Sequence, residues 1–159
     1  MDYETVFSLA EPYLKKNDFG LPHTRRVFEI AKNNFEIPKD IEELVCCSII
    51  MHDIGGSTIE KQYKNGPEIA ATLLAKLGYP KAFVDQVCEF IRTHHDHPDS
   101  PSLAFKILYD SDKLVMFSPE EYPHYLSHPN FDWNQIIDLI YHPHAKELAK
   151  QLLQKRRNE

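Results

Sequence analysis

The sequence predicts an all-α fold of about seven or eight helices. Apolar residues recur at intervals of three and four positions through most of the 159 residues, which is the period of one face of an α-helix. No stretch shows the sustained alternation of apolar and polar residues that a half-buried strand requires. Capping residues, glycines and prolines fall between the apolar stripes and divide the chain into successive helices.

The first six predicted helices follow from these stripes, and they cover residues 2–16, 23–34, 40–52, 67–77, 83–94 and 102–117. Asp40 followed by Glu43 resembles a capping box at the start of the third helix. Pro67 suits the first position of the fourth helix. Residues 54–66 begin with two glycines and end with Asn-Gly, so we predict a loop there.

The C-terminal part contains three more helix signals. Ser118 with Glu121 resembles a capping box, and Asp132 with Gln135 resembles the start of a further helix. Pro143 is expected to divide residues 132–155 into two helices, because proline interrupts a helix interior.

Composition narrows the classes of function. Apolar residues make up 42% of the chain and no run is long enough for a membrane span, so we expect no membrane partner. The N-terminus does not resemble a secretion signal, which favours a cytoplasmic protein. A net charge of −6 argues against binding to a nucleic-acid polymer. The three cysteines lack a C-x-x-C spacing and are predicted to be buried free thiols.

The stretch SIIMHDIGG places His52 and Asp53 at the end of an apolar stripe. A carboxylate buried alone costs several kcal/mol, so Asp53 must be exposed, paired or bound to a metal. A single histidine on an apolar face is ordinarily a hydrogen-bonded core residue, and a metal site needs further ligands. The other candidates at helix ends or on apolar faces are His23, His94 and Asp112.

The ordered set of these residues resembles a known signature. His23 in HTRRV, His52-Asp53 in HDIG and Asp112 in DSDKL resemble the H…HD…D pattern of the HD-domain superfamily of metal-dependent phosphohydrolases. The similarity covers most of residues 20–117 and includes YKNGPEIAATLLAKLGYP and VCEFIRTHH. It implies a helical HD-domain bundle over residues 1–159, with a signature region at 20–117 and C-terminal helices at 118–156 packing on it.

The resemblance also implies a metal site. His23, His52, Asp53 and Asp112 are expected to bind one divalent cation, and the ligand types do not distinguish Mn, Fe, Co, Ni, Zn or Mg. Two-metal members of the family carry a further histidine in the middle helix. Residues 54–93 contain no histidine, and Gln62 or Asn65 stands near that position, so we expect a single metal ion.

Further residues are assigned expected roles in catalysis. Asp53 belongs to the reactive centre, and His94, with His95 as a second candidate, is expected to bind phosphate or transfer a proton. Arg26 and Lys113 are predicted to grip the phosphate, although each is also consistent with an ordinary surface charge. Some family members use a glutamate shortly after the HD pair as general acid. Here the next glutamate, Glu60, is seven positions past Asp53, so that role is unassigned.

The remaining polar residues have weaker signals. Asp110 is expected either beside the metal ligands or in solvent, and the last five histidines are expected to face solvent: His97, His124, His128, His142 and His144. Residues 54–66, 95–102 and 118–131 are expected to wall the pocket. Five aromatic residues in and next to residues 118–131 are expected mainly to pack on the bundle rather than to stack on a base: Phe117, Tyr122, Tyr125, Phe131 and Trp133.

Two functions of different classes follow from the resemblance. The first is a metal-dependent phosphohydrolase, a phosphomonoesterase or phosphodiesterase, that acts on a small phosphate ester such as a nucleotide. The second is a regulatory module that keeps the metal- or nucleotide-binding scaffold without turnover, which the unassigned general acid leaves open. The sequence specifies neither the substrate nor the oligomeric state.

Overall fold

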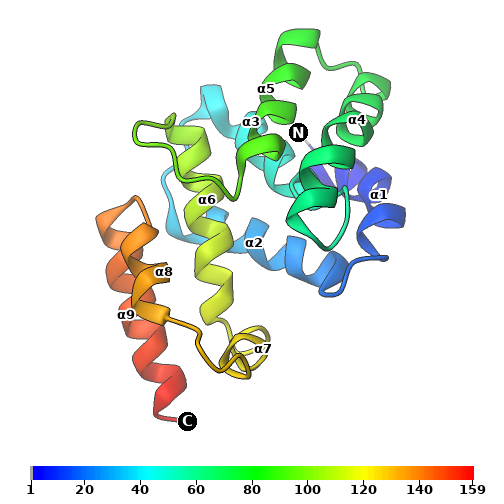
Figure 1. Cartoon of the computed structure of the whole chain (residues 1–159). Coiled ribbons are helices and arrows are strands. Elements are labelled where there is room, and N and C mark those ends of the chain that lie inside the picture. Colours follow the sequence, from blue (N-terminus) through cyan, green and yellow to red (C-terminus); the bar gives the residue numbers. More distant parts are fainter. Residues whose placement is uncertain (1) are drawn as a thin grey trace.

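The computed structural model describes residues 2–159 as nine α-helices and one short 3₁₀ helix (Figure 1). The elements are α1 (Tyr3–Leu14), α2 (Gly20–Asn34), α3 (Lys39–Met51), α4 (Ile59–Lys76), α5 (Lys81–Thr93), α6 (Leu103–Leu114), η1 (Val115–Phe117), α7 (Tyr122–Leu126), α8 (Trp133–Leu139) and α9 (Pro143–Arg157). Residues 2–159 contain no strand, which confirms the predicted all-α class. No helix in this range combines the length and apolarity needed to cross a bilayer.

Helix α3 lies at the centre of the bundle. It packs against α1, α2, α5 and α6, and every residue from Leu44 to Met51 is buried. Helix α6 packs on α2 and α3, while α4 and α5 form a closely packed pair beside α3 (Figure 1). Cys46, Cys47 and Cys88 are buried and unpaired in disulfides, as predicted. The ends of four helices, α2, α3, α5 and α6, can therefore supply side chains to one region.

Helix α4 differs most from the prediction. It begins at Ile59, where the Thr58 side chain accepts the N–H of Lys61, so the predicted loop over 54–66 is wrong from residue 59 onward. Pro67 lies inside this helix rather than at its start. Gly66 is used for close packing, because a Cβ there would lie 2.8 Å from Ile91 Cγ2 of α5. The earlier start of α4 places its first turns beside the residues that follow Asp53.

Other helix boundaries also differ in detail. Helix α2 begins at Gly20, one turn before His23. Helix α3 begins after Pro38 and has no side-chain cap, so the predicted capping box at Asp40 is wrong. By contrast, Asp132 accepts the backbone N–H groups of residues 134 and 135, and α9 begins at Pro143, which confirms both predicted helix starts.

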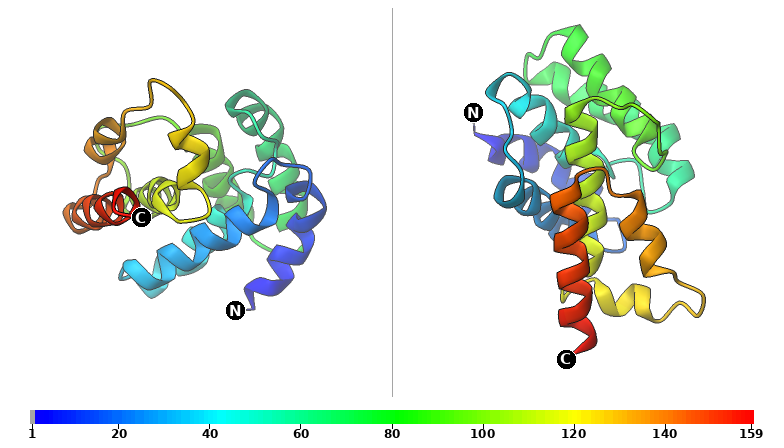
Figure 2. Two further views of the ribbon diagram at one scale, coloured as in Figure 1. Left: turned by 90° about the horizontal axis from the view of Figure 1, so that it is seen from below. Right: turned by 90° about the vertical axis from the view of Figure 1, so that its left-hand side faces the viewer.

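A buried carboxylate joins the C-terminal helices to α6. Asp110 is fully buried and accepts hydrogen bonds from the backbone N–H of Tyr141 at 2.8 Å, the N–H of His142 at 2.9 Å and the His142 ring Nδ1 at 2.6 Å. Asp110 is therefore not solvated, and His142 is partly buried rather than solvent-facing. Helix α9 packs along α6 (Figure 2, right). This contact fixes the turn between α8 and α9 on the bundle.

We expect Asp110→Ala to destabilise the protein by about 3 kcal/mol, because it leaves two buried backbone donors and an imidazole without their acceptor. Urea denaturation followed by circular dichroism measures the change. Asp138→Ala, which removes an exposed carboxylate from α8, is the control and should change the free energy of unfolding by less than about 0.5 kcal/mol. Equal stability of the two variants would contradict the role given to Asp110.

Candidate metal centre

Two histidines of the centre occupy equivalent positions at helix C-termini. His52 follows the last residue of α3 and His94 follows the last residue of α5. The Nδ1 atom of each ring donates to the carbonyl three residues earlier, Ile49 at 2.6 Å and Ile91 at 2.8 Å. Both carbonyls lie in the last turn of their helix, where the regular hydrogen bonds of the helix end, and the Ile49 carbonyl also accepts the His52 N–H at 3.4 Å. The bonds place the proton on Nδ1 and turn each Nε2 toward the interior of the site.

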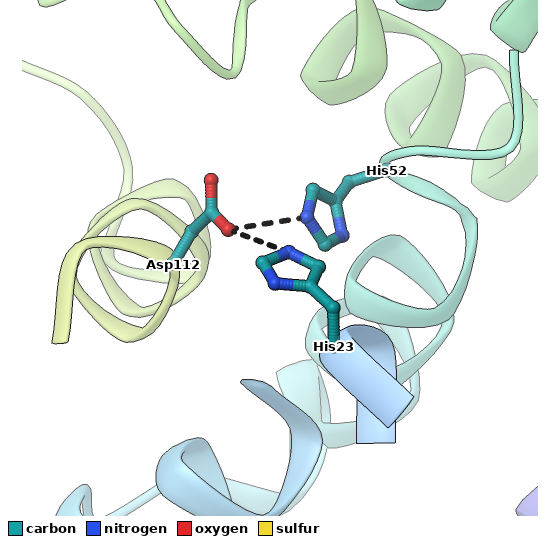
Figure 3. A group of neighbouring side chains, drawn as sticks. All are labelled: His23, His52 and Asp112. Carbon is teal, nitrogen blue, oxygen red and sulfur yellow. Dashed lines mark ion pairs between the residues drawn. The ribbon is translucent and has the colours of Figure 1, made fainter. Parts of the chain in front are cut away.

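The four predicted ligands converge although they are distant in sequence. His23 Nε2 lies 3.2 Å from Asp53 Oδ2 and 3.3 Å from Asp112 Oδ1. His52 Nε2 lies 3.3 Å from each of the same two oxygens. Asp112 reaches from α6 toward both imidazole rings (Figure 3). The arrangement brings two ring nitrogens and two carboxylate oxygens to one point.

The chemistry of this donor set fits a metal ion. His52 is fully buried, and its Nε2 makes no hydrogen bond although two carboxylate oxygens are near it. A buried polar atom without a partner is costly, and an imidazole nitrogen directed at two carboxylates is a common metal-ligand arrangement. Ligand atoms of His23, His52 and Asp112 all lie within 4.8 Å of one another, a spacing that could hold one ion.

A second group of side chains adjoins the first through Asp53. Its other oxygen, Oδ1, lies 3.5 Å from His94 Nε2, and ligand atoms of Asp53, His94 and His95 lie within 4.8 Å of one another. Gln62 Oε1 lies 3.1 Å from His94 Nε2 and 2.8 Å from His95 Nε2. The Gln62 amide nitrogen donates to the Gly56 carbonyl, which directs the amide oxygen at the two rings. Gln62, on the first turns of α4, thus occupies the space between this histidine pair and the HD turn.

The buried charges shift one another's pKa values. Burial alone lowers the pKa of His52, but the Asp53 and Asp112 carboxylates outweigh it and raise the pKa to about 10. His23 is shifted upward in the same way. Burial raises the pKa of both aspartates, yet the neighbouring imidazoles hold them well below their usual range. Without a metal ion, the two rings therefore carry protons that compensate the carboxylates.

The pKa of His95 moves in the opposite direction. Burial lowers it, and the adjacent His94 ring lowers it further, to about 4. The ring is consequently neutral at pH 7. Its Nε2 faces the Gln62 oxygen, an acceptor, so the proton is on Nε2.

Glu121 belongs to the centre although the sequence analysis assigned it only to a helix cap. Its carboxylate is fully buried, with Oε2 2.9 Å and Oε1 3.1 Å from His23 Nδ1. Arg26 donates to Glu121 Oε2 through Nε at 3.0 Å and Nη2 at 2.9 Å. The Ser118 hydroxyl does accept the Glu121 N–H, but the helix there, α7, spans only Tyr122–Leu126. The role of Glu121 beside His23 is visible only in the tertiary structure, because its spacing from Ser118 in the sequence is that of an ordinary capping box.

The centre opens into a cavity of about 420 Å³. His23, Asp53, His95 and Asp112 line its inner end, together with Lys113, whose ammonium lies 5.0 Å from the centre of the Tyr109 ring. The walls come from residues 17–20, 56–57, 59, 62, 116 and 124–125. Residues 17–20 were not predicted, and of the segment 95–102 only His95 contributes.

One predicted site residue, Arg26, lies outside the cavity, and most of the C-terminal aromatic residues pack on the bundle as expected. Arg26 does not line the cavity, because its guanidinium is bonded to Glu121 on the far side of His23. Among the aromatic residues of the C-terminal segment, Tyr125 lines the cavity, whereas Phe117, Tyr122 and Phe131 pack around Trp133. His124 also lines the cavity, so it faces the pocket as well as solvent.

Two hydrogen bonds join the cavity wall to the turn that contains His52 and Asp53. The side-chain amide of Asn17 donates to the backbone carbonyl of Asp53 at 2.8 Å, and Ser57 Oγ accepts the N–H of Asp18. The loop after α1 is thereby fixed to the residues that follow α3. Gly55 allows this turn to approach α4, since a Cβ there would lie 2.5 Å from the Lys61 carbonyl oxygen.

Comparison with known proteins agrees with the resemblance found in the sequence. No curated protein matches the chain. A crystal structure of a predicted HD superfamily hydrolase from an uncultured Thermotogales bacterium has the same fold, with a TM-score of 0.68 and 20% identity, over 98% of this chain and 87% of that one. The family model of the HD domain matches residues 20–116, which is more than half of the chain. With its two histidines and two aspartates gathered at one point, the chain belongs to the HD-domain family.

Proposed function

We propose that this protein is a metal-dependent phosphohydrolase that uses one divalent cation to hydrolyse a small phosphate ester, with nucleotides as the foremost candidates. The observation that carries the proposal is the unpartnered Nε2 of His52, buried between the carboxylates of Asp53 and Asp112. His23, His52, Asp53 and Asp112 are the proposed ligands. A divalent ion, when bound, supplies the Lewis acidity that makes water a nucleophile at neutral pH and offsets negative charge on a phosphoryl group.

Charge balance supports one ion rather than two. Two carboxylates, Asp53 and Asp112, offset the charge of one divalent cation. The group formed by Asp53, His94 and His95 adds no carboxylate of its own, because Asp53 is shared and Gln62 is neutral. A second ion would leave uncompensated positive charge in a largely buried site. We therefore assign His94 and His95 to substrate or proton handling.

The remaining side chains suit the binding of a phosphate. Lys113 follows the proposed ligand Asp112 and lines the cavity, so it is the cation that we assign to a phosphate oxygen. His95 lines the same cavity as a neutral ring whose Nε2–H is donated to Gln62 Oε1. Asp53 would hold the metal through Oδ2, which lies 3.2 Å from His23 Nε2, while its Oδ1 lies 3.5 Å from His94 Nε2, so this carboxylate would join the metal site to the histidine pair.

The general acid stays unassigned. Glu60, the first glutamate after the HD pair, is exposed on α4 and does not line the cavity. This observation favours a second candidate function, a regulatory module that binds metal and a nucleotide without turnover. The two functions differ in a direct assay of hydrolysis.

We expect the metal-replete protein to hydrolyse at least one compound in a panel of nucleotides, phosphomonoesters and phosphodiesters. His52→Ala and Asp53→Ala should reduce the rate to that of a protein-free control, because each removes a proposed ligand. Release of phosphate or of the leaving alcohol measures the rate with Mn²⁺, Co²⁺, Ni²⁺, Zn²⁺ and Mg²⁺ in turn. Equal background rates for the wild type and both variants, with metal bound to the wild type, would favour the regulatory module.

Lys113→Met should lower kcat/KM by about ten- to a hundredfold, the loss expected for one charge-assisted hydrogen bond to phosphate. Metal content should be unchanged, because Lys113 is not a proposed ligand. Arg92→Met is the control, since it removes an exposed cation that pairs with Glu89 outside the cavity. Identical kinetics for the two variants would remove Lys113 from the phosphate site.

Metal binding should release protons, because the raised pKa values keep His23 and His52 protonated in the metal-free protein. The affinity should rise with pH between 6 and 8, by about tenfold per pH unit for each proton released. Calorimetric titration at pH 7 in buffers of different ionisation enthalpy measures the number of protons and the stoichiometry, expected to be one ion per chain. A binding enthalpy independent of the buffer would contradict the protonated state, and two ions per chain would contradict the charge argument.

A further inference from the structure

We propose that Glu121 is a positioning residue for the metal site. Glu121 holds the His23 ring through Nδ1, and Arg26 in turn holds Glu121. The inference rests on the proposed metal site and adds two residues to it. Glu121 lies beyond residues 20–116, the part of the chain that the family model matches. The segment after α6 would therefore complete the metal centre as well as wall the cavity.

His23 needs an external partner that the other two rings do not need. His52 and His94 each follow a helix C-terminus and donate Nδ1–H to a carbonyl in the last turn of their own helix. His23 lies near the N-terminus of α2, where the carbonyls are engaged in the helix itself. The buried Glu121 carboxylate takes the place of that carbonyl, at 2.9 Å from Nδ1. The bond places a proton on Nδ1 and leaves Nε2 directed at Asp53 and Asp112.

A carboxylate partner does more than orient the ring. Hydrogen bonding from the second nitrogen of a ligating imidazole to a carboxylate makes the ring a stronger electron donor to the metal, and loss of such a partner typically weakens metal binding by about 10–100-fold. A backbone carbonyl, which carries no net charge, has a weaker effect. His23 should accordingly be the most strongly donating imidazole of the centre.

Arg26 holds the Glu121 carboxylate in place. Its Nε and Nη2 both donate to Oε2, the oxygen that is also nearest His23 Nδ1. The Arg26 side chain is 24% exposed while the Glu121 side chain is fully buried, so the guanidinium closes the carboxylate off from solvent. The three buried carboxylates Asp53, Asp112 and Glu121 together with the Arg26 guanidinium carry a formal charge of −2. One divalent cation balances that charge.

A purely structural ion pair between α2 and residues 118–121 is the alternative, and it differs in its effect on the metal. The experiment titrates the metal-free full-length protein with Co²⁺ alone, following the visible absorption of the bound ion and the heat of binding. Glu121→Gln preserves the shape of the side chain and removes its charge. Glu120→Gln makes the same change at the neighbouring, exposed glutamate and is the matched control.

We expect Glu121→Gln to raise the Kd for Co²⁺ by about 10–100-fold and to shift the absorption of the bound ion. Its gain in Tm on Co²⁺ addition should be smaller than that of the wild type, each variant being compared with its own metal-free form. Glu120→Gln should match the wild type in all three measurements. If Glu121→Gln does not fold, Arg26→Lys provides the test, with a smaller increase in Kd expected because the pair with Glu121 is weakened but retained.

The outcomes separate this inference from the proposed function. A wild-type protein that binds no Co²⁺ or other divalent cation overturns the metal site itself. Normal binding by the wild type, with unchanged Kd and absorption in Glu121→Gln, overturns only the positioning role. A lower Tm of that variant at unchanged affinity would identify Glu121 and Arg26 as a structural ion pair.

Discussion

The carboxylates of Asp53 and Asp112 must be compensated, and the arrangement around them depends on that constraint. Both are largely removed from water and share the imidazoles of His23 and His52 as neighbours. The charges can be balanced by protons on the rings or by a cation between them. Since both arrangements use the same atoms, a metal ion would compete with protons for this site.

The direction of the helices also favours positive charge at the centre, whether it is carried by protons or by a cation. The C-terminal ends of α3 and α5 and the last turn of α6 meet at the centre, and the dipole of each helix places partial negative charge there. His52 follows the buried part of α3, Leu44–Met51, so the ring is held by close-packed neighbours. Of the cavity walls, residues 17–19 belong to the loop before α2 and residues 124–125 belong to the short helix α7.

Local periodicity predicted the helices and the resemblance to the HD signature predicted the residues that meet, whereas the start of α4 and the position of Glu121 depend on tertiary contacts. The stripe of α3 identified His52, and the ordered signature identified His23, Asp53 and Asp112 as residues that meet. The start of α4 was missed because Asn65-Gly66 is a turn signal, whereas Gly66 serves close contact with Ile91. Glu121 was hidden because the same Ser-x-x-Glu spacing describes a helix cap and says nothing about a partner 98 positions away.

The hydrogen bonds at the ends of α3 and α5 explain why imidazoles occupy these positions. His52 and His94 each use one nitrogen on a backbone carbonyl and present the other, on the opposite side of the ring, to the centre. A thiolate or a carboxylate could serve as an electron donor there but has no N–H to give the carbonyl. These positions therefore favour a rigid side chain with two nitrogens. A substitution that preserves only the ligating atom would remove the hydrogen bond to the carbonyl in the last turn of the helix.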